Sequence, residues 1–359
     1  MKKKKVAIVG IVGVPANYGG YETMVDNMLD YTPEDIEYTV YCSKPAYKER
    51  PKEYKGAKLK YFPFKANGPQ ALFYDLLCTI HAYFHSDTIL SLGNTGTLIY
   101  PILNLFCHKR IIHNYDGYET NREKWNPFVK WLTKCIQKAA SRYSAVHVAD
   151  NEAMVPILKK LYSVDSVIIE YGGDGAFVVK DDKQLEEDYN LKPQEYYFNV
   201  ARIEPENNIH IMLDAFAQMP EKKLVIVGNW HKNEYGDNLY KKYSDYSNMK
   251  LLNPIYDSKK INLLRSNCIV YIHPHSVGGT NPSLVEAMFL GLPIITYDVV
   301  FNRSTTEEEA IYFSDANDLI KEINKLDDNM LETKRNKMKE IAMRRYTWKL
   351  ISEKYVEQY

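Results

Sequence analysis

The sequence predicts an α/β protein built from two doubly wound domains. Short apolar, β-branched runs alternate with helix-length segments along most of the 359 residues, and such alternation is typical of parallel sheets covered by helices. The length suits two domains of roughly 150 residues each. A polar, charged stretch at 173–194 separates two series of runs. We therefore expect a Rossmann-like domain over 1–175 and a second over 190–341, facing each other across a cleft.

The expected strands are apolar almost throughout, as strands covered on both faces of a parallel sheet should be. In the first domain they cover 5–10, 37–42, 59–64, 88–93, 109–114, 145–150 and 166–172. In the second they cover 196–202, 223–229, 249–255, 268–275, 293–299 and 310–314. Helices are expected at 20–31, 69–86, 127–142, 208–219 and 281–290. A last helical stretch, about 342–359, is expected to pack back on the first domain.

Composition excludes several classes of protein. The 46 basic and 46 acidic residues cancel, whereas a nucleic-acid binder needs a basic face for phosphates. The five cysteines are scattered singly and indicate a reducing compartment. No apolar run is long enough to cross a membrane, and the run after the initial lysines is too short for a signal peptide. We therefore expect a cytoplasmic protein. The sequence has neither a D-x-D at the end of an apolar strand nor a His/Cys cluster with zinc spacing, so we expect no obligatory metal.

The glycine-rich loop GIVGVPANYGGYE joins the first strand to a helix. Backbone amides at such a helix N-terminus can face an anion, and glycines let the backbone approach a ligand. The glycines are Gly10, Gly13, Gly19 and Gly20, which do not match the G-x-G-x-x-G of dinucleotide-binding proteins. The second strand also ends in YCSK rather than in an acidic residue. We therefore expect no NAD; an ordinary tight turn is the alternative.

A second glycine loop occurs in HPHSVGGTNPSLVEAMFLGLPIITYD, residues 273–298. A strand ends at His275 and a helix is expected to begin near Asn281 or Pro282, since proline favours an early helical position. Amides of the loop can cradle a phosphate. Glu286, about one turn into the helix, can accept hydrogen bonds from sugar hydroxyls of the same ligand. The alternative is a solvated surface glutamate.

Charged residues follow two further strands. NVARIEPENN delivers Arg202 to the carboxyl end of a strand, where doubly wound sheets place ligand contacts, and a guanidinium suits a diphosphate. A surface salt bridge to Glu204 or Glu206 is the alternative for this arginine. IIHNYDGYETNREKWN is a second such segment, and it brings His113, Asp116, Glu119 and Arg122 together. Such a cluster can orient a hydroxyl nucleophile and a leaving group.

Taken together, these motifs resemble glycosyltransferases of the GT-B fold, family 4. The segments GVPANYGGYE, NYDGYETNREKW, RIEPENN and HSVGGTNPSLVEAM resemble in particular bacterial rhamnosyltransferases of capsule and cell-wall polysaccharide assembly. The resemblance implies transfer of a 6-deoxyhexose, L-rhamnose from dTDP-L-rhamnose, with retention of configuration. It implies an acceptor sugar on a polyprenyl diphosphate at the inner face of the cell membrane. The nucleotide sugar is a substrate, and no cofactor is implied.

The resemblance also assigns donor-side residues. Glu286 matches the second glutamate of the family's E-x7-E motif, and the first falls on Gly278. Arg202 matches the diphosphate-binding arginine, and the lysine that usually follows falls on Asn207 or Asn208. We interpret these departures as a pocket for a 6-deoxy sugar. Its expected donor-binding residues are Gly19, Gly20, Arg202, Asn207, Asn208, Gly278, Gly279, Thr280, Asn281 and Glu286.

On the acceptor side, the resemblance makes Asp116 a catalytic residue with Arg202 and Glu286. Asp116 would position the sugar or the acceptor, because the leaving phosphate helps to deprotonate the acceptor hydroxyl in a front-face route. Further acceptor-side candidates are Tyr18, His113, Glu119 and Arg122.

The segment 61–86 is rich in aromatic and aliphatic residues, and most stripes of this kind belong to a core. Together with Lys2–Lys5 it suggests instead a contact with an anionic membrane surface.

Three alternatives remain on sequence grounds. One alternative is a glycosyltransferase with a UDP- or GDP-sugar donor. Another is a non-catalytic nucleotide- or glycan-binding scaffold, which the absence of the family's first glutamate and lysine would explain. A nucleotide-sugar epimerase or dehydrogenase would need a dinucleotide fingerprint and a Tyr-x-x-x-Lys pair, which YCSKPAYK does not supply.

Overall fold

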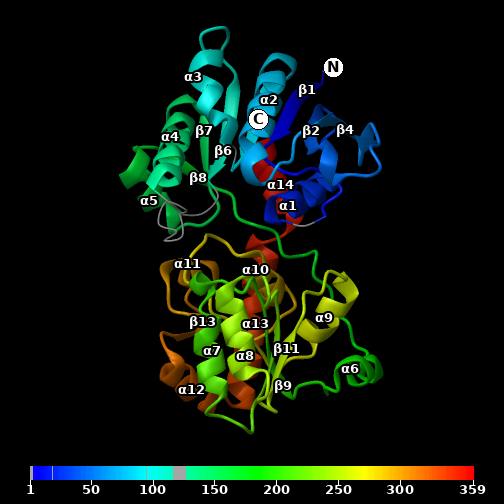
Figure 1. The fold of residues 1–359 in the computed structure, drawn as a ribbon, viewed down its shortest axis with the longest axis vertical. Helices are drawn as coiled ribbons and strands as arrows, with labels where there is room; N and C mark the ends of the chain where they lie inside the picture. The colour runs from blue at the N-terminus through cyan, green and yellow to red at the C-terminus, as the bar shows by residue number, and fades with distance from the viewer. Residues whose placement is uncertain (1–2, 18, 94, 116–126) are drawn as a thin grey trace. The chain divides into compact units, whose positions relative to one another are not determined.

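Two sheets, each covered by helices, organise the chain (Figure 1). The computed structural model describes residues 3–17, 19–93, 95–115 and 127–359. It divides into a first unit, Met1–Tyr171 with Trp348–Tyr359, and a second unit, Gly172–Thr347. The sequence placed these limits at 175, 190 and about 342. The predicted fold class, α/β with two Rossmann-like parallel sheets, is confirmed.

The sheet of the first unit has the order β3-β4-β2-β1-β5-β6-β7-β8. All neighbours are parallel except β3 and β4, which form an antiparallel pair. The strands are β1 (Lys4–Val9), β2 (Ile36–Ser43), β3 (Glu53–Tyr54), β4 (Ala57–Phe62), β5 (Thr88–Leu92), β6 (Arg110–Tyr115), β7 (Val146–Ala149) and β8 (Ser166–Ile168). Only the two-residue β3 was not expected, because it has no apolar periodicity of its own.

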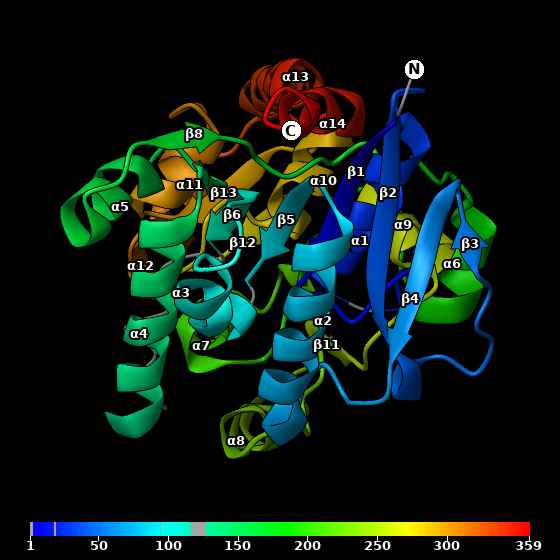
Figure 2. The same cartoon turned by 90° about the horizontal axis from the view of Figure 1, so that it is seen from above.

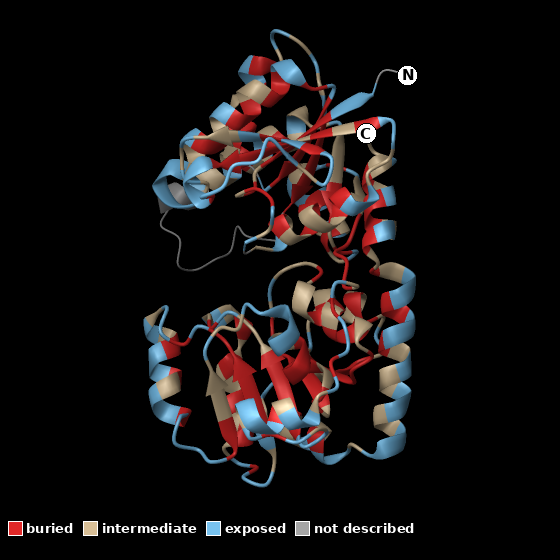
Figure 3. Ribbon diagram, turned by 90° about the vertical axis from the view of Figure 1, so that its right-hand side faces the viewer, coloured by how far each residue is buried: buried red, intermediate tan, exposed pale blue. Residues whose placement is uncertain are grey.

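The helices of this unit are α1 (Gly20–Met28), α2 (Ala71–His85), α3 (Tyr100–Leu103), α4 (Pro127–Tyr143), α5 (Met154–Tyr162) and α14 (Trp348–Val356). One face of α2 enters the core, where Tyr74, Cys78 and Ala82 are fully buried. They pack on Ala7 and Val9, which face the same side of β1 because strand side chains alternate. Figure 3 shows the strands as mostly buried and the outer helix faces as exposed.

The sheet of the second unit is parallel throughout, with the order β11-β10-β9-β12-β13-β14. Its strands are β9 (Tyr196–Val200), β10 (Lys223–Val227), β11 (Met249–Leu252), β12 (Val270–His273), β13 (Ile294–Tyr297) and β14 (Ile311–Phe313). Its helices are α6 (Asp182–Tyr189), α7 (Ile209–Phe216), α8 (Glu234–Tyr243), α9 (Ser258–Ser266), α10 (Pro282–Phe289), α11 (Val300–Thr305), α12 (Ala316–Asn324) and α13 (Asp328–Arg345).

Both sheets reverse their strand order beside their first strand. β1 lies between β2 and β5, and β9 lies between β10 and β12. Helices that follow such neighbouring strands turn to opposite faces, which leaves a crevice at the carboxyl ends of the strands. Doubly wound proteins bind their ligands at this switch point. The fold therefore directs attention to the loops after β1 and β5, and to those after β9 and β12.

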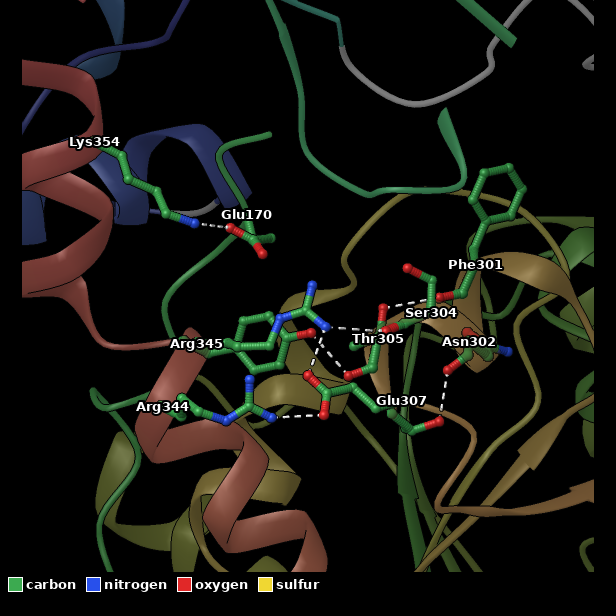
Figure 4. A network of polar contacts seen from close by, with 11 residues as sticks. Glu170, Phe301, Asn302, Ser304, Thr305, Glu307, Arg344, Arg345 and Lys354 are labelled. Atoms are coloured by element: carbon green, nitrogen blue, oxygen red, sulfur yellow. Dashed lines mark hydrogen bonds and ion pairs between the residues drawn. The ribbon is translucent and has the colours of Figure 1, made fainter. Parts of the chain in front are cut away.

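The chain returns from the second unit to the first at Thr347, and polar contacts anchor it on each side of this crossing (Figure 4). In the second unit, the guanidinium groups of Arg344 and Arg345 lie 2.6 and 2.9 Å from the Glu307 carboxylate. In the first unit, Lys354 of α14 pairs with the buried Glu170 at 2.6 Å. The last helix is thus a built-in part of the first unit.

Within the described part of the chain, no helix has the length and apolar character that crossing a membrane requires.

Candidate functional site

The loops after β9 and β12 form one connected edge at the switch point of the second unit. The side-chain amide of Asn208 donates to the Pro274 carbonyl at 3.0 Å. The Ser276 hydroxyl and amide both donate to the Glu206 carbonyl, at 2.9 and 3.2 Å. Because hydrogen bonds join the two loops directly, a ligand would meet a preformed surface here.

Arg202 stands at this edge, directly beyond β9. Its side chain is exposed, and among the described residues its guanidinium has no ion pair or hydrogen bond. Its carbonyl is held by the buried Asn207 side chain at 2.7 Å. The alternative, a salt bridge to Glu204 or Glu206, is not formed among the described residues, and Glu204 lies 3.7 Å from Lys232 instead. The backbone is therefore fixed while the cation stays available.

The glycine loop on the other side of the switch point is open. Gly278 has a φ of +123°, which favours glycine, and nothing lies within 4 Å of where a Cβ would project. No described acceptor takes the amides of Gly278 and Gly279. As expected, α10 begins at Pro282, and its N-cap Asn281 accepts a hydrogen bond from the Ser283 amide at 3.1 Å. Free amides and a helix N-terminus together suit an anion.

Glu286 lies in the middle of α10 and forms an ion pair that the sequence did not reveal. Its carboxylate is 2.8 Å from the guanidinium of Arg265 on α9. The Arg265 side chain is 5% exposed and that of Glu286 is 28% exposed. The buried cation therefore orients a carboxylate that still reaches solvent. Glu286 is therefore not the solvated surface glutamate that was the alternative on sequence grounds.

Gly173 also constrains the position of α10, because its backbone packs directly against this helix. A Cβ at Gly173 would lie 2.6 Å from the Val285 carbonyl oxygen, so only glycine allows this approach. The sequence alone assigns this glycine to the polar stretch 173–194, because nothing local distinguishes a glycine in a turn from one against a helix.

Two buried histidines underlie the same edge. The rings of His273 and His275, at the end of β12, stack 4.2 Å apart and nearly parallel. Both ring nitrogens of His273 and Nδ1 of His275 lack a partner among the described residues. Burial lowers the pKa of His275 to about 3, and the nearby Arg202 acts in the same direction. Both rings are therefore neutral at neutral pH. Because side chains of a strand alternate between its two faces, the spacing of two residues could have shown that both histidines lie on the same face.

The corresponding loop of the first unit has another design. The Glu22 carboxylate of α1 accepts the Val12 amide at 2.7 Å, and Asp26 accepts the Ala16 amide at 2.7 Å. Glu22 also lies over Gly19, where a Cβ would come within 1.9 Å of its oxygen. Gly19 is the N-cap and Gly20 the first residue of α1. Side-chain carboxylates of the chain itself thus take two of the amides that were expected to face an anion.

His113 is a buried strand residue of β6, only 1% exposed. Its Nδ1 lies 3.2 Å from the Ser91 hydroxyl, and burial lowers its pKa to about 3. Its neighbour Asn114 links two helices: the Tyr21 hydroxyl of α1 donates to its oxygen at 3.0 Å, and its amide donates to Tyr355 of α14 at 2.5 Å. Tyr18, Asp116, Glu119 and Arg122 lie outside the described residues.

Other features of the described residues do not add to this site. A hollow of about 430 Å³ is lined by residues such as Glu195 and Lys223 at the starts of β9 and β10, the edge opposite Arg202. Among the described side chains, no three His, Cys, Asp or Glu residues are arranged to hold a metal ion.

The two halves of the chain match two protein families. Residues 181–345 match glycosyl transferases group 1, and residues 3–174 match a domain of unknown function, DUF1972. Among curated proteins, none matches the chain significantly.

Solved structures share the whole fold at low sequence identity. Sucrose-phosphate synthase from Thermosynechococcus elongatus is 16% identical over 99% of this chain and 98% of its own, with a TM-score of 0.80. Anabaena HepE in complex with UDP is 15% identical over 99% of both chains, with a TM-score of 0.74. Trehalose-6-phosphate synthase OtsA is 10% identical over 99% and 98%, with a TM-score of 0.74. Likenesses at such identity show the GT-B fold alone.

Proposed function

The chain is a group 1 glycosyltransferase with an N-terminal DUF1972 domain, and on this premise we propose that it is a retaining rhamnosyltransferase. It moves L-rhamnose from dTDP-L-rhamnose to a sugar carried on a polyprenyl diphosphate, in bacterial polysaccharide synthesis. The observation that carries the donor part of this proposal is the edge of the second unit that joins Arg202, the Gly278–Asn281 loop and Glu286.

The diphosphate of the donor is assigned to Arg202 and to the loop amides. As the glycosidic bond breaks, the leaving nucleoside diphosphate gains negative charge, and donors that are already in place stabilise it without rearrangement. The Arg202 guanidinium is unpaired among the described residues and projects from a backbone that Asn207 holds. Charge-assisted bonds to phosphate are the strongest that such a side chain forms.

The nucleoside is assigned to Glu286. Its carboxylate keeps part of its surface in solvent while Arg265 holds it in one orientation. An ionised carboxylate accepts hydrogen bonds only, which matches sugar hydroxyls as donors. Arg265 acts on the nucleotide through Glu286 and is a positioning residue.

Gly278 supports a 6-deoxy sugar as the transferred group. The family motif that the sequence resembles has a glutamate at this position, whereas here neither a side chain nor a neighbouring atom occupies the space of a Cβ. Loop amides donate hydrogen bonds but accept none, so they suit hydroxyl oxygens and leave room for a methyl group. Gly279, Thr280 and Asn281 complete this part of the proposal, and Asn207 and Asn208 serve it by holding the loops together.

The acceptor is assigned to the first unit, where Asp116 would position its hydroxyl with Tyr18, Glu119 and Arg122. No separate base is needed if the leaving phosphate takes the proton. His113 is buried within the sheet, so its contribution would be to support the strand that carries Asp116.

A UDP-sugar donor is the second candidate, because a protein of the same fold, Anabaena HepE, has been solved with UDP. A GDP-sugar donor and a non-catalytic scaffold are further outcomes that the same experiment separates.

The test is a thermal-shift comparison of the full chain with dTDP, UDP and GDP, since a ligand that binds only the folded state raises the melting temperature. We expect dTDP to give the largest shift and Glu286→Ala to reduce it. Glu332→Ala, which changes an exposed glutamate of α13, is the matched control. Incubation with dTDP-L-rhamnose and a polyprenyl-diphosphate sugar should then yield a rhamnosylated lipid with the anomeric configuration of the donor.

A larger shift with UDP or GDP would replace the sugar donor while keeping the enzyme class. Binding of dTDP without transfer to any lipid-linked acceptor would favour the scaffold.

A further inference from the structure

The helices on one face of the first sheet carry apolar side chains on their outer surface as well as toward the core. On α2, Phe73, Leu77 and Phe84 are 59, 40 and 54% exposed. Their spacing of four and seven residues places them on one side of the helix. The opposite side of the same helix is buried in the core. A helix that is apolar on both sides has a partner on each in ordinary proteins, and here the outer side faces solvent.

This surface continues beyond α2. Figure 2 shows α2, α3 and α4 next to one another, and α3 contacts α4 directly. Ile102 of α3 and the following Leu105 and Phe106 are 53, 82 and 72% exposed. The Tyr83 hydroxyl donates to the Cys107 carbonyl at 2.7 Å, so the end of α2 lies against this segment. We call Phe73, Leu77, Phe84, Ile102, Leu105 and Phe106 the outer apolar surface.

Charge is segregated around the outer apolar surface, although the chain as a whole is neutral. The segments 61–87, 95–110 and 127–143 contain two acidic residues, the buried Asp75 and the exposed Asp87, whose carboxylate accepts the Lys5 amide. The same segments contain the basic residues Lys65, Lys109, Arg110, Lys130, Lys134, Lys138 and Arg142. Lys65, Lys134 and Lys138 are exposed.

The N-terminal lysines join this surface in space rather than in sequence. The Lys5 amide donates to the Asp87 carboxylate at 2.9 Å, and the Asp87 amide donates to the Lys5 carbonyl at 2.9 Å. Asp87 follows Phe84 by three residues. The exposed Lys3 and Lys4, which precede Lys5, therefore lie near the end of α2.

We propose that the outer apolar surface and the surrounding lysines dock this protein on an anionic phospholipid bilayer, with α2 lying in the plane of the interface. Exposed aromatic and aliphatic side chains with a rim of lysines are what an interfacial helix needs, since apolar burial and attraction to anionic lipids act together. A second copy of the chain fits less well, because a two-fold contact would bring two basic stripes together. The docking does not depend on which sugar is moved.

The experiment is sedimentation of the full chain with vesicles of phosphatidylcholine, with and without phosphatidylglycerol. The chain should sediment with the anionic vesicles, less so at high salt, because salt screens exposed charges. The combined variant Phe84→Ser, Leu105→Ser and Phe106→Ser should reduce partitioning at least about tenfold. Its matched control is Leu161→Ser, Val178→Ser and Met343→Ser, which changes side chains that are 44, 53 and 58% exposed elsewhere.

A charge variant tests the rim by itself. Lys65→Gln, Lys134→Gln and Lys138→Gln should weaken binding to anionic vesicles by about tenfold or more, since each lysine near such a surface contributes. Lys259→Gln, Lys260→Gln and Lys321→Gln in the second unit should leave it unchanged.

Three results would overturn the proposal: a wild-type chain that does not sediment with anionic vesicles, an apolar variant that sediments like the wild type, or a wild-type dimer that the apolar variant dissociates. Unchanged nucleotide-induced thermal shifts in all variants show that folding is intact. They also keep this outcome separate from that of the proposed transfer reaction.

Discussion

The two units share a strand order but treat the amides at their switch points in opposite ways. In the first unit, Glu22 and Asp26 accept the amides of Val12 and Ala16 after β1. In the second, no described acceptor takes the amides of Gly278 and Gly279 after β12. One loop is filled by carboxylates of its own helix, whereas in the other the amides of these two glycines have no acceptor among the described residues.

This difference teaches that a glycine loop after a strand is not by itself an anion site. Glycines allow a close approach, but a carboxylate in the next helix turn can fill the place of the ligand. Within the described residues, the second unit adds an arginine without an ion pair to the amides of Gly278 and Gly279, which have no acceptor, whereas two amides of the first loop already donate to carboxylates. This contrast is the reason why we propose the second unit as the site of the nucleotide diphosphate and the first as the site of the acceptor.

Lowering the pH should produce the largest difference between the two units, because their free energies of unfolding depend on pH in different ways. His275 has a pKa near 3 in the folded unit against 6.5 without burial, so below about pH 6.5 the unfolded chain binds a proton that the folded unit does not. Its contribution to the free energy of unfolding is complete above that pH and falls by about 2 kcal/mol by about pH 5. The pKa of His273 is lowered by burial as well, so it acts in the same direction.

In the first unit, His113 acts likewise but Asp75 opposes it. Burial raises the pKa of Asp75 to about 6, so the folded unit binds this proton more readily than the unfolded chain and gains stability as the pH falls. Hydrogen exchange at pH 7 and pH 5 should show β12 losing protection before β6. Earlier loss in β6 would contradict the comparison, and His275→Asn should flatten the dependence in the second unit.

Removal of the buried cation under Glu286 comes next in size. Arg265→Met should lower the free energy of unfolding by about 2 kcal/mol, less than for a fully buried pair because Glu286 keeps contact with solvent. It should also weaken nucleotide binding, because Glu286 loses its orientation, and Arg265→Lys should restore part of the binding. Urea unfolding and calorimetry measure the two effects.

The control is Arg303→Met, which breaks the solvent-exposed pair with Asp298 and should change the free energy of unfolding by less than about 1 kcal/mol. Equal effects of both variants would mean that the Arg265 pair has no special role.

A smaller effect is expected in the opening loop of the first unit. Glu22→Gln keeps an acceptor for the Val12 amide but removes its charge, and should lower the free energy of unfolding by about 1 kcal/mol. Nucleotide affinity should not change, because the proposed diphosphate site lies on the other unit. A Glu22→Gln variant with altered nucleotide affinity would place the phosphate on the first unit instead.

The smallest effect is expected at the link between α14 and β6. Tyr355→Phe removes the hydroxyl that accepts the Asn114 amide and should lower the free energy of unfolding by roughly 1 kcal/mol or less. Transfer activity should fall with it if β6 positions Asp116 for the acceptor. A matched change, Tyr246→Phe on an exposed ring of the second unit, should affect neither quantity.

Much of the fold was accessible from the sequence because buried parallel strands are apolar along their whole length. The runs at 196–202 and 268–275, for example, correspond to β9 and β12. The start of α10 was accessible for a local reason, since Asn281 and Pro282 are typical of a helix start. The return of the last helix to the first unit was expected from about residue 342, but the exact crossing at Thr347 was not, because no local signal separates α13 from α14.

The site was only partly accessible for the same kind of reason. Arg202 and Glu286 follow strand and helix signals that can be read along the chain. Arg265 lies 21 positions before Glu286 on another helix, and their pairing depends on how α9 and α10 pack. The carboxylates that fill the first loop were equally hidden, because the sequence does not show which way Glu22 and Asp26 point.

The most direct test of the central claim, that the second unit holds the diphosphate, is a calorimetric titration of the full chain with the nucleoside diphosphate that stabilises it best. Arg202→Ala should weaken binding by about 10- to 100-fold, the loss expected for hydrogen bonds to a charged group. Arg303→Ala, whose guanidinium is already paired with Asp298, should bind like the wild type. An Arg202→Ala variant with wild-type affinity would contradict the account.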